Sequence, residues 1–128
     1  MIYIIDDDKS VQRGFLLLVQ SAGCEAKAFL SVDEFFEGAE LTDRDCIITD
    51  LRMPGRDGFQ LMEELRSRRI SVPVIVVTAY DNAESRQLAW KLGAKAFFRK
   101  PVDDQTLIEA INWSMEEGRK TQRGESKA

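Results

Sequence analysis

The chain has 128 residues, of which 44% are hydrophobic and 31% charged, with no histidine and a net charge of −4 at pH 7. This length and balance indicate one globular domain; the negative charge argues against direct nucleic-acid binding by it, and the missing histidine excludes histidine catalysis and the usual zinc sites. No apolar stretch approaches the ~18 residues of a membrane span, and acidic residues interrupt the N-terminus where a signal peptide needs its apolar core, so we expect a cytoplasmic location without membrane contact.

Strand and helix patterns alternate along the chain. In chain order, the sequence predicts a strand at 2–5, a helix at 9–23, an edge strand at 24–29, a helix at 31–39, a strand at 45–50, a helix at 59–69, a strand at 72–78, a helix at 83–93, a strand at 94–98 and a helix at 103–118. This alternation predicts an α/β fold in which helices cover both faces of a parallel sheet. The polar segment 119–128 is expected to be a flexible tail or the start of a linker.

Local signals support individual features of this fold. Ser31 followed three residues later by Glu34 predicts a capping box at the start of the helix at 31–39. Cys24 and Cys46 lie in apolar contexts without metal-ligand spacing, which predicts two buried free thiols.

Polar residues with related chemistry follow the buried strands. The residues that end the first, third, fourth and fifth strands are Asp6 with Asp7, Asp50, Thr78, and Lys100. Carboxyl ends of parallel strands lie on one edge of the sheet, so we expect these side chains to converge. Mg²⁺ prefers carboxylate oxygens, and a carboxylate in such a site can attack phosphorus to form an acyl phosphate. The sequence therefore predicts a site for Mg²⁺, or Mn²⁺ in its place, which would relieve the repulsion between neighbouring aspartates.

Four segments carry a resemblance to a known family. They are IIDDD at 4–8, IITDLRMPGRDG at 47–58, VIVVTAY at 74–80 and GAKAFFRKP at 93–101. In this order they resemble the receiver domain of two-component response regulators, and the motifs TDLRMP and SVDEFF are similar to its FixJ-like branch. The resemblance covers residues 1–118 and implies a single doubly wound (βα)5 flavodoxin-like domain with strand order 2-1-3-4-5.

The resemblance implies roles for the acidic residues. Asp50 matches the phosphoryl acceptor, Asp7 the direct metal ligand, and Asp6 the residue that holds the metal through water. Arg52 stands where the family supplies a backbone carbonyl to the metal. Because the chain has no histidine, the phosphoryl donor must come from elsewhere. The resemblance implies a phosphohistidine on a partner kinase, for which small acyl or amido phosphates could substitute. The domain would be a signalling switch that catalyses only its own phosphorylation and dephosphorylation.

Further residues match the signalling part of the family pattern. Thr78 matches the hydroxyl that binds the phosphoryl group, and Lys100 matches the cation that pairs with it. Phe97 matches the switch aromatic, which is tyrosine in many members. Without a hydroxyl, a switch at Phe97 would have to work by packing alone, and Phe97 could equally be a plain core residue. Tyr80 and the Arg52 side chain are expected to overhang the site, where they could either lengthen or shorten the lifetime of the acyl phosphate.

The resemblance also implies partners. Members of the FixJ-like branch usually carry a DNA-binding helix-turn-helix after the receiver domain, so DNA binding and transcription control are expected through an output domain that this sequence does not contain. A phosphorylation-dependent homodimer is expected through the helix at 83–93, the strand at 94–98 and the helix at 103–118. Trp90 is either an exposed contact for such a partner or a packing residue.

Two other functions fit parts of the sequence. The segment Asp6-Asp7-Asp8-Lys9-Ser10 fits the D-x-D-x-S pattern of haloacid dehalogenase-like phosphatases, in which Asp6 would be the nucleophile and Asp8 the general acid. A flavodoxin-like electron carrier would share the fold, but the chain lacks a Ser/Thr/Gly-rich phosphate loop after the first strand. Asp8 could instead simply begin the helix at 9–23, where a negative charge is favoured.

Overall fold

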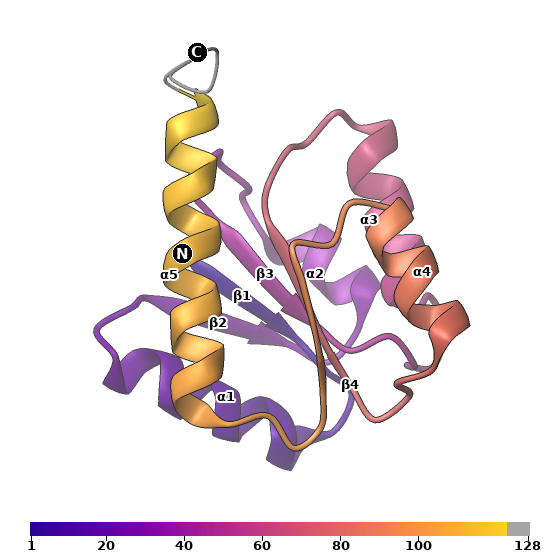
Figure 1. Ribbon diagram of the computed structural model, residues 1–128, viewed down its shortest axis with the longest axis horizontal. Helices are drawn as coiled ribbons and strands as arrows, with labels where there is room; N and C mark the ends of the chain where they lie inside the picture. The colour runs from indigo at the N-terminus through magenta and orange to yellow at the C-terminus, as the bar shows by residue number, and fades with distance from the viewer. Residues whose placement is uncertain (123–128) are drawn as a thin grey trace.

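The computed structural model describes residues 1–122, in which five strands alternate with five helices (Figure 1). The elements are β1 (Ile2–Ile5), α1 (Lys9–Ser21), β2 (Ala26–Phe29), α2 (Val32–Gly38), β3 (Cys46–Thr49), α3 (Gly58–Ser67), β4 (Val74–Thr78), α4 (Ala83–Lys91), β5 (Ala96–Arg99) and α5 (Asp104–Gln122). The strands form one parallel sheet in the order β2-β1-β3-β4-β5. The predicted doubly wound fold and its strand order are confirmed. Within residues 1–122, no helix combines the length and apolar character needed to cross a membrane.

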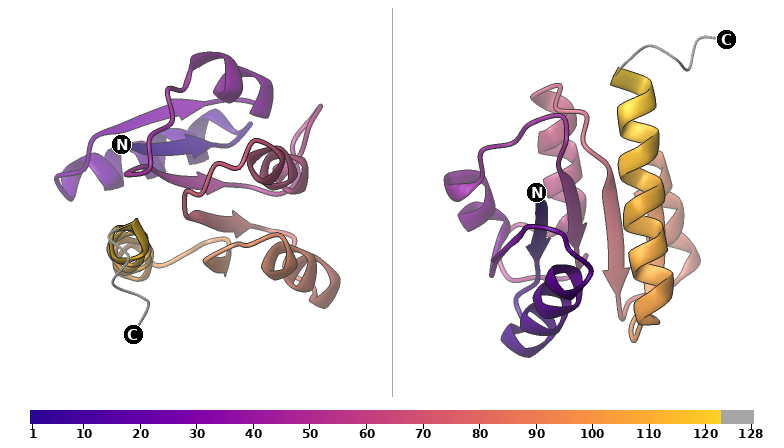
Figure 2. Two further views of the ribbon diagram at one scale, coloured as in Figure 1. Left: turned by 90° about the horizontal axis from the view of Figure 1, so that it is seen from above. Right: turned by 90° about the vertical axis from the view of Figure 1, so that its left-hand side faces the viewer.

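Two apolar cores form because β1, β3 and β4 are buried along their whole length. One face of the sheet packs against α2, α3 and α4 through residues such as Phe35, Leu61 and Ala89. The other face packs against α1 and α5 through residues such as Val19 and Leu107. All five strands run the same way, and their carboxyl ends lie toward the lower edge of the molecule in Figure 1 and in the right-hand view of Figure 2.

The last helix extends beyond its predicted end. α5 continues to Gln122 instead of ending at residue 118, so residues 119–122 are helical and the predicted tail does not begin at residue 119. The predicted helix ends at Gly118, but a glycine inside a helix costs only about 1 kcal/mol, and the arginine, lysine and glutamine that follow favour helix. The remainder of the predicted tail, 123–128, lies outside the described residues.

Side-chain caps define where α2 and α3 begin. The predicted capping box at α2 is only partial: Ser31 Oγ accepts a hydrogen bond from the Glu34 N–H, but the Glu34 carboxylate accepts one from Leu30 instead of Ser31. A complete box occurs at α3, where Asp57 and Gln60 each accept a hydrogen bond from the other's backbone N–H. The sequence analysis did not predict this second box, which fixes the end of the loop between β3 and α3.

The two cysteines are free, as predicted, but they differ in burial. Cys46 is buried in β3, and burial raises the pKa of its thiol to about 12. Cys24 is only partly buried, so the prediction of two buried thiols holds for Cys46 and is wrong for Cys24. Cys24 differs because it lies between the turn after α1 and β2, which is an edge strand of the sheet.

Candidate functional site

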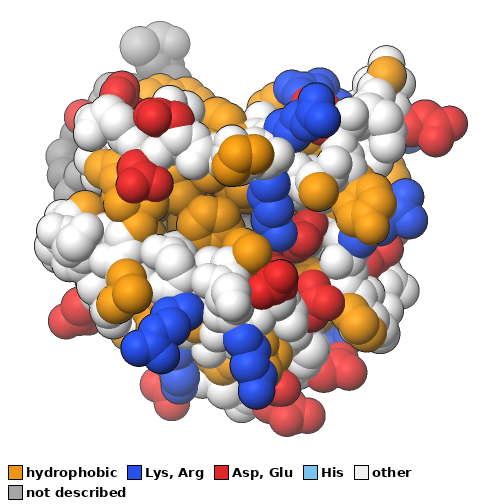
Figure 3. All heavy atoms as spheres, turned by 90° about the horizontal axis from the view of Figure 1, so that it is seen from below, with side chains coloured by type: hydrophobic (Ala, Val, Ile, Leu, Met, Phe, Trp, Pro, Cys, Tyr) orange, Lys and Arg blue, Asp and Glu red, His pale blue; other side chains and the backbone are white. Residues whose placement is uncertain are grey.

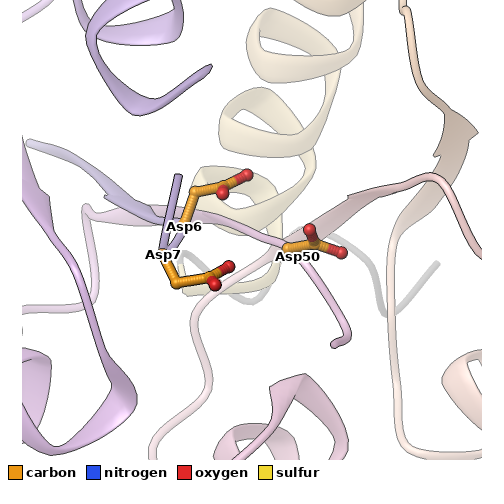
Figure 4. A group of neighbouring side chains, drawn as sticks. All are labelled: Asp6, Asp7 and Asp50. Carbon is orange, nitrogen blue, oxygen red and sulfur yellow. The ribbon is translucent and has the colours of Figure 1, made fainter. Parts of the chain in front are cut away.

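Three carboxylates from two strand ends meet at the carboxyl edge of the sheet. Asp6 and Asp7 follow β1, Asp50 follows β3, and one oxygen from each lies within 4.8 Å of the others. Figure 4 shows the Asp6 and Asp7 side chains extending toward the side on which Asp50 lies. In the space-filling view from below, acidic side chains gather near the centre of the face beside a basic one (Figure 3). The predicted convergence of the three aspartates is confirmed.

Backbone N–H groups and a cation hold the Asp50 carboxylate. Asp50 is 7% exposed, and its Oδ1 accepts hydrogen bonds from the N–H groups of Leu51 at 2.6 Å and Arg52 at 3.4 Å. Its Oδ2 accepts a hydrogen bond from Lys100 Nζ at 2.8 Å. Because the two oxygens have different partners, the carboxylate is fixed in one orientation.

The Lys100 ammonium bridges the two buried carboxylates. Its Nζ lies 2.8 Å from Asp6 Oδ2 and 2.8 Å from Asp50 Oδ2. Burial acts to lower the pKa of Lys100, but the hydrogen bonds to Asp50 and Asp6 outweigh burial and raise that pKa above its usual value. Burial raises the pKa of Asp6, although Lys100 opposes this shift. The repulsion between the buried aspartates is therefore already offset in part by a side chain of the protein itself.

The three consecutive aspartates make different contacts. Asp6 is 2% exposed and accepts a hydrogen bond from the Asp8 N–H at 3.0 Å, whereas Asp7 is exposed. The Asp8 carboxylate caps α1 by accepting hydrogen bonds from the N–H groups of Ser10 and Val11. The interpretation that Asp8 begins the helix is confirmed. Because its carboxylate is engaged there, the phosphatase function, which needs Asp8 as a general acid, has no support.

Thr78 ends β4 with its side chain fully buried. Its Oγ1 accepts a hydrogen bond from the Tyr80 N–H at 3.1 Å. Among the described residues, no hydrogen bond joins Thr78 to Asp50. The hydroxyl is therefore bonded to the loop between β4 and α4.

Arg52 and Tyr80 connect the loops that follow β3 and β4. The Arg52 guanidinium carbon lies 5.0 Å from the centre of the Tyr80 ring, which is within cation–π range. Half of the Tyr80 side chain is exposed, and Arg52 is exposed as well. The structure thus joins the two residues that were expected to overhang the site. Their effect on an acyl phosphate stays a prediction.

A cation covers the Phe97 ring, which the sequence analysis did not predict. Phe97 in β5 is 6% exposed, and the Arg86 guanidinium carbon lies 4.8 Å from the centre of its ring. Arg86 also donates two hydrogen bonds to Asp81 Oδ1, at 2.7 and 3.2 Å. A switch at Phe97 that works by packing alone stays a prediction, and Arg86 is a further contact of the ring. No sequence pattern pairs residue 86 with residue 97, because their contact depends on how α4 lies against β5.

A glycine at the start of α3 allows a close approach to the backbone of Asp50. A Cβ atom placed on Gly58 would lie 2.4 Å from the Asp50 carbonyl oxygen and 3.1 Å from the Leu51 Cα. The Gly58 N–H also donates a hydrogen bond to the Leu51 carbonyl at 3.0 Å. The sequence analysis did not single out Gly58. The sequence did hold a signal for this contact. The first position of a helix does not need a glycine for its backbone angles, so a glycine there can indicate that another part of the chain approaches closely.

The donor set suits a hard divalent cation. Asp6, Asp7 and Asp50 supply carboxylate oxygens from three side chains, two of which are buried. In proteins, Mg²⁺ binds carboxylate and carbonyl oxygens and keeps several waters, and the exposed Asp7 leaves one side of the cluster open to solvent. Arg52, the predicted source of a backbone carbonyl ligand, belongs to the loop that begins at Asp50.

Known proteins with similar sequences are response regulators. The chain matches the response regulator receiver domain family over residues 2–112. The transcriptional regulatory protein FixJ of Azorhizobium caulinodans is 37% identical over 123 residues, which cover 96% of this chain and 57% of that protein. The transcriptional regulatory protein TdiR of Thauera aromatica is 31% identical over 111 residues, which cover 87% of this chain and 49% of that protein. The chain therefore spans about half the length of these curated relatives.

Solved structures agree with the sequence matches. The response regulator StyR superposes with a TM-score of 0.88 at 30% identity, covering 98% of this chain and 63% of that one. The crystal structure of FixJ-N gives a TM-score of 0.79 at 30% identity, covering 90% of this chain and 92% of that one. With the family match over almost the whole chain and the acidic site at the end of the sheet, the chain belongs to the response regulator receiver domain family and is a phosphoacceptor module of two-component signalling.

Proposed function

We propose that Asp50 is the residue that accepts the phosphoryl group. The observation that carries this proposal is a buried carboxylate whose Oδ1 is held by backbone N–H groups and whose Oδ2 faces the Lys100 ammonium. In the transfer, a bond forms between an Asp50 oxygen and phosphorus while the phosphorus–nitrogen bond of a phosphohistidine breaks. Receiver domains take phosphoryl groups from histidine kinases, and this chain has no histidine that could serve as its own donor.

Lys100 and the acidic cluster would stabilise the charge of the phosphoryl group. The Lys100 ammonium already lies beside Asp50, so it can pair with a phosphoryl oxygen after a small movement. Asp6, Asp7 and Asp50, with the backbone carbonyl of Arg52, would hold Mg²⁺ or Mn²⁺. A divalent cation bound there offsets negative charge on the phosphoryl oxygens. Positioning and charge stabilisation are most of what phosphoryl transfer requires of a protein.

Thr78 and Phe97 would convert phosphorylation into a change of packing. A phosphoryl group adds about −1.5 to −2 charges and three acceptor oxygens at Asp50. The Thr78 hydroxyl now accepts from the Tyr80 N–H, and it can donate its own proton to a phosphoryl oxygen if the end of β4 moves. Phe97 would repack as this segment moves. The phosphoryl group favours the new packing only through contacts that the unphosphorylated packing lacks.

The output surface would be α4, β5 and α5. Leu88 and Trp90 of α4 are 41% and 46% exposed, which is the exposure expected of residues kept for a partner. A homodimer that forms on phosphorylation would bury them. The relatives are named transcriptional regulatory proteins and are about twice as long as this chain, so DNA would be bound by an output domain outside it. A histidine kinase and DNA as partners would place the domain in the cytoplasm.

The lifetime of the acyl phosphate would be set within the domain. We expect it to act as a signalling switch that catalyses only its own phosphorylation and dephosphorylation. Because the Arg52–Tyr80 contact ties together the loops after β3 and β4, Arg52→Ala and Tyr80→Ala should loosen both loops and speed hydrolysis by roughly 2- to 5-fold. Decay of the phosphorylated protein, followed by phosphate-affinity gel electrophoresis, measures this rate. Unchanged lifetimes in both variants would refute the tuning role.

The acceptor is tested by replacing Asp50 with asparagine. Wild-type protein incubated with Mg²⁺ and acetyl phosphate should gain one phosphoryl group in intact-mass spectrometry, and Asp50→Asn should gain none. Glu37→Gln, an exposed acidic residue of α2, is the matched control and should be phosphorylated like the wild type. Covalent phosphate on Asp50→Asn in the same amount as on the wild type would overturn the assignment. If Asp50→Asn and Glu37→Gln both failed to be phosphorylated, the loss would be explained by the removal of a negative charge and would not identify Asp50 as the acceptor.

A further inference from the structure

We propose that the Asp81–Arg86 ion pair is a latch that holds Phe97 in its present packing until phosphorylation moves the end of β4. This inference rests on the proposed roles of Thr78 and Phe97 and adds two positioning residues that act through them. The latch has two contacts, the double hydrogen bond from Arg86 to Asp81 and the cation–π contact from Arg86 to Phe97.

The first contact places Arg86 over the ring. Phe97 belongs to the core cluster on the α4 side of the sheet, and its backbone pairs with Val76 of β4. The guanidinium carbon lies 4.8 Å from the ring centre, and the ring is almost completely buried. Phe97 therefore lies between the sheet and a cation, and a ring that left this place would lose the cation–π attraction as well as its packing.

The second contact ties Arg86 to the loop that must move. Asp81 lies three residues after Thr78, in the loop between β4 and α4, and Asn82 then caps α4 by accepting a hydrogen bond from the Ser85 N–H. The Tyr80 N–H donates to Thr78 Oγ1, so the loop is also bonded directly to the Thr78 side chain. A shift of Thr78 toward a phosphoryl group on Asp50 would thus carry Asp81 with it, while Arg86 stays on the helix.

The geometry gives the latch a direction. The Thr78 hydroxyl accepts from the Tyr80 N–H and, among the described residues, makes no hydrogen bond to Asp50, so the latch contacts stabilise the packing in which Thr78 is bonded to the loop. A movement of Asp81 would either stretch its hydrogen bonds to Arg86 or draw Arg86 off the Phe97 ring. A ligand that binds only the switched packing binds more weakly in proportion to how rarely the free protein adopts that packing. Removing the latch should therefore make the domain easier to switch.

The probe for the test is beryllofluoride, which mimics a phosphoryl group, titrated calorimetrically at a fixed saturating concentration of Mg²⁺. Arg86→Gln and Asp81→Asn should each lower the apparent Kd for beryllofluoride by about 2- to 5-fold, the factor expected for a partly exposed cation–π contact. Arg13→Gln, which removes an exposed arginine of α1, is the matched control and should leave the Kd unchanged. An unchanged or higher Kd in both latch variants would overturn the proposal.

A second measurement separates the latch from a purely structural role. Phe97→Leu keeps an apolar side chain but has no ring for a cation to bind, so Arg86→Gln should have no further effect on the Kd in a Phe97→Leu background. Arg86→Lys should recover part of the wild-type Kd because it restores a cation. If Arg86→Gln changes the Kd equally in both backgrounds, its effect does not pass through the ring and the latch is refuted.

The outcomes distinguish the latch from the function on which it rests. If wild-type protein binds beryllofluoride and Asp50→Asn does not, the proposed acceptor stands and the variants of Arg86 and Asp81 decide the latch alone. If wild-type protein binds no beryllofluoride in the presence of Mg²⁺, both proposals fall.

Discussion

The close contact between α3 and the loop that begins at Asp50 can be tested by adding a single methyl group. In Gly58→Ala, the new Cβ would lie 2.4 Å from the carbonyl oxygen of Asp50 and 3.1 Å from the Cα of Leu51. Ordinary contact between such atoms requires more than 3 Å, and both neighbours belong to the backbone, so neither can turn aside as a side chain would. Either the start of α3 or the Asp50 loop must move by roughly half an ångström or more.

The expected cost follows from this overlap. Extra methyl groups forced into a well-packed region typically lower the free energy of unfolding by about 1–3 kcal/mol. The backbone angles of Gly58 need no glycine, so conformational strain adds nothing to this figure. Gly14→Ala is the matched control, because a Cβ at Gly14 has open space around it in the exposed interior of α1. There the same methyl group should raise stability by roughly 0.5–1 kcal/mol through the better helix propensity of alanine.

Urea unfolding followed by circular dichroism measures both variants. With a urea dependence of about 1–3 kcal/mol per molar, Gly58→Ala should unfold at a clearly lower urea concentration than the wild type, and Gly14→Ala at a slightly higher one. Because the displaced backbone also carries Asp50, the proposed acceptor, Gly58→Ala should weaken beryllofluoride binding, while Gly14→Ala should not. A Gly58→Ala protein with wild-type stability and wild-type binding would refute the reasoning.

Three further predictions use other parts of the site and the core. Asp8→Ala removes the cap of α1 and should lower the free energy of unfolding, measured in urea, by about 1 kcal/mol. Acyl-phosphate formation should continue in this variant; if the folded variant were no longer phosphorylated, Asp8 would have a role in the site beyond capping the helix. Because the pKa of Cys46 is raised to about 12, iodoacetamide at pH 8 should label Cys24 and spare Cys46 in the native protein, as peptide mass spectrometry can check; rapid labelling of both would show that β3 opens easily. Lys100→Met removes a cation from the acidic cluster and should tighten Mg²⁺ binding in calorimetry while slowing phosphorylation; weaker Mg²⁺ binding would show that Lys100 mainly holds the cluster together.

The fold could be predicted because its signals are strong and local. β1, β3 and β4 are short apolar runs that the structure buries along their whole length, and helical patterns lie between them. The predicted end of the last helix was wrong because a single residue was too weak a signal against the helix-forming residues around it. Gly118 does not end α5, because one glycine is a small penalty in a long helix with good helix formers on both sides.

The charged site could be predicted in part for a topological reason. Side chains that follow parallel strands must share an edge, so the convergence of Asp6, Asp7 and Asp50 follows once the strands are identified. The contacts of Arg86 and Gly58 could not be found in this way. They depend on how α4 lies against β5 and how closely α3 approaches the Asp50 loop, and these distances are set by tertiary packing.

Lys100 explains how the acidic cluster is compatible with a stable fold in two states. Two buried carboxylates without a cation would be strongly unfavourable, and Lys100, 50 residues from Asp50 along the chain, supplies that cation. If Asp50 is the acceptor, as proposed, phosphorylation moves its charge outward onto phosphoryl oxygens, and we expect Lys100 to follow it. We expect the same cation to pair with the site before and after phosphorylation, so that the change between the two packings would lie in where Lys100 and Thr78 direct their hydrogen bonds. Neither packing would then contain an unpaired buried charge. The two packings would differ only in which acceptors receive the hydrogen bonds of Lys100 and Thr78, so a modest difference in free energy can decide between them.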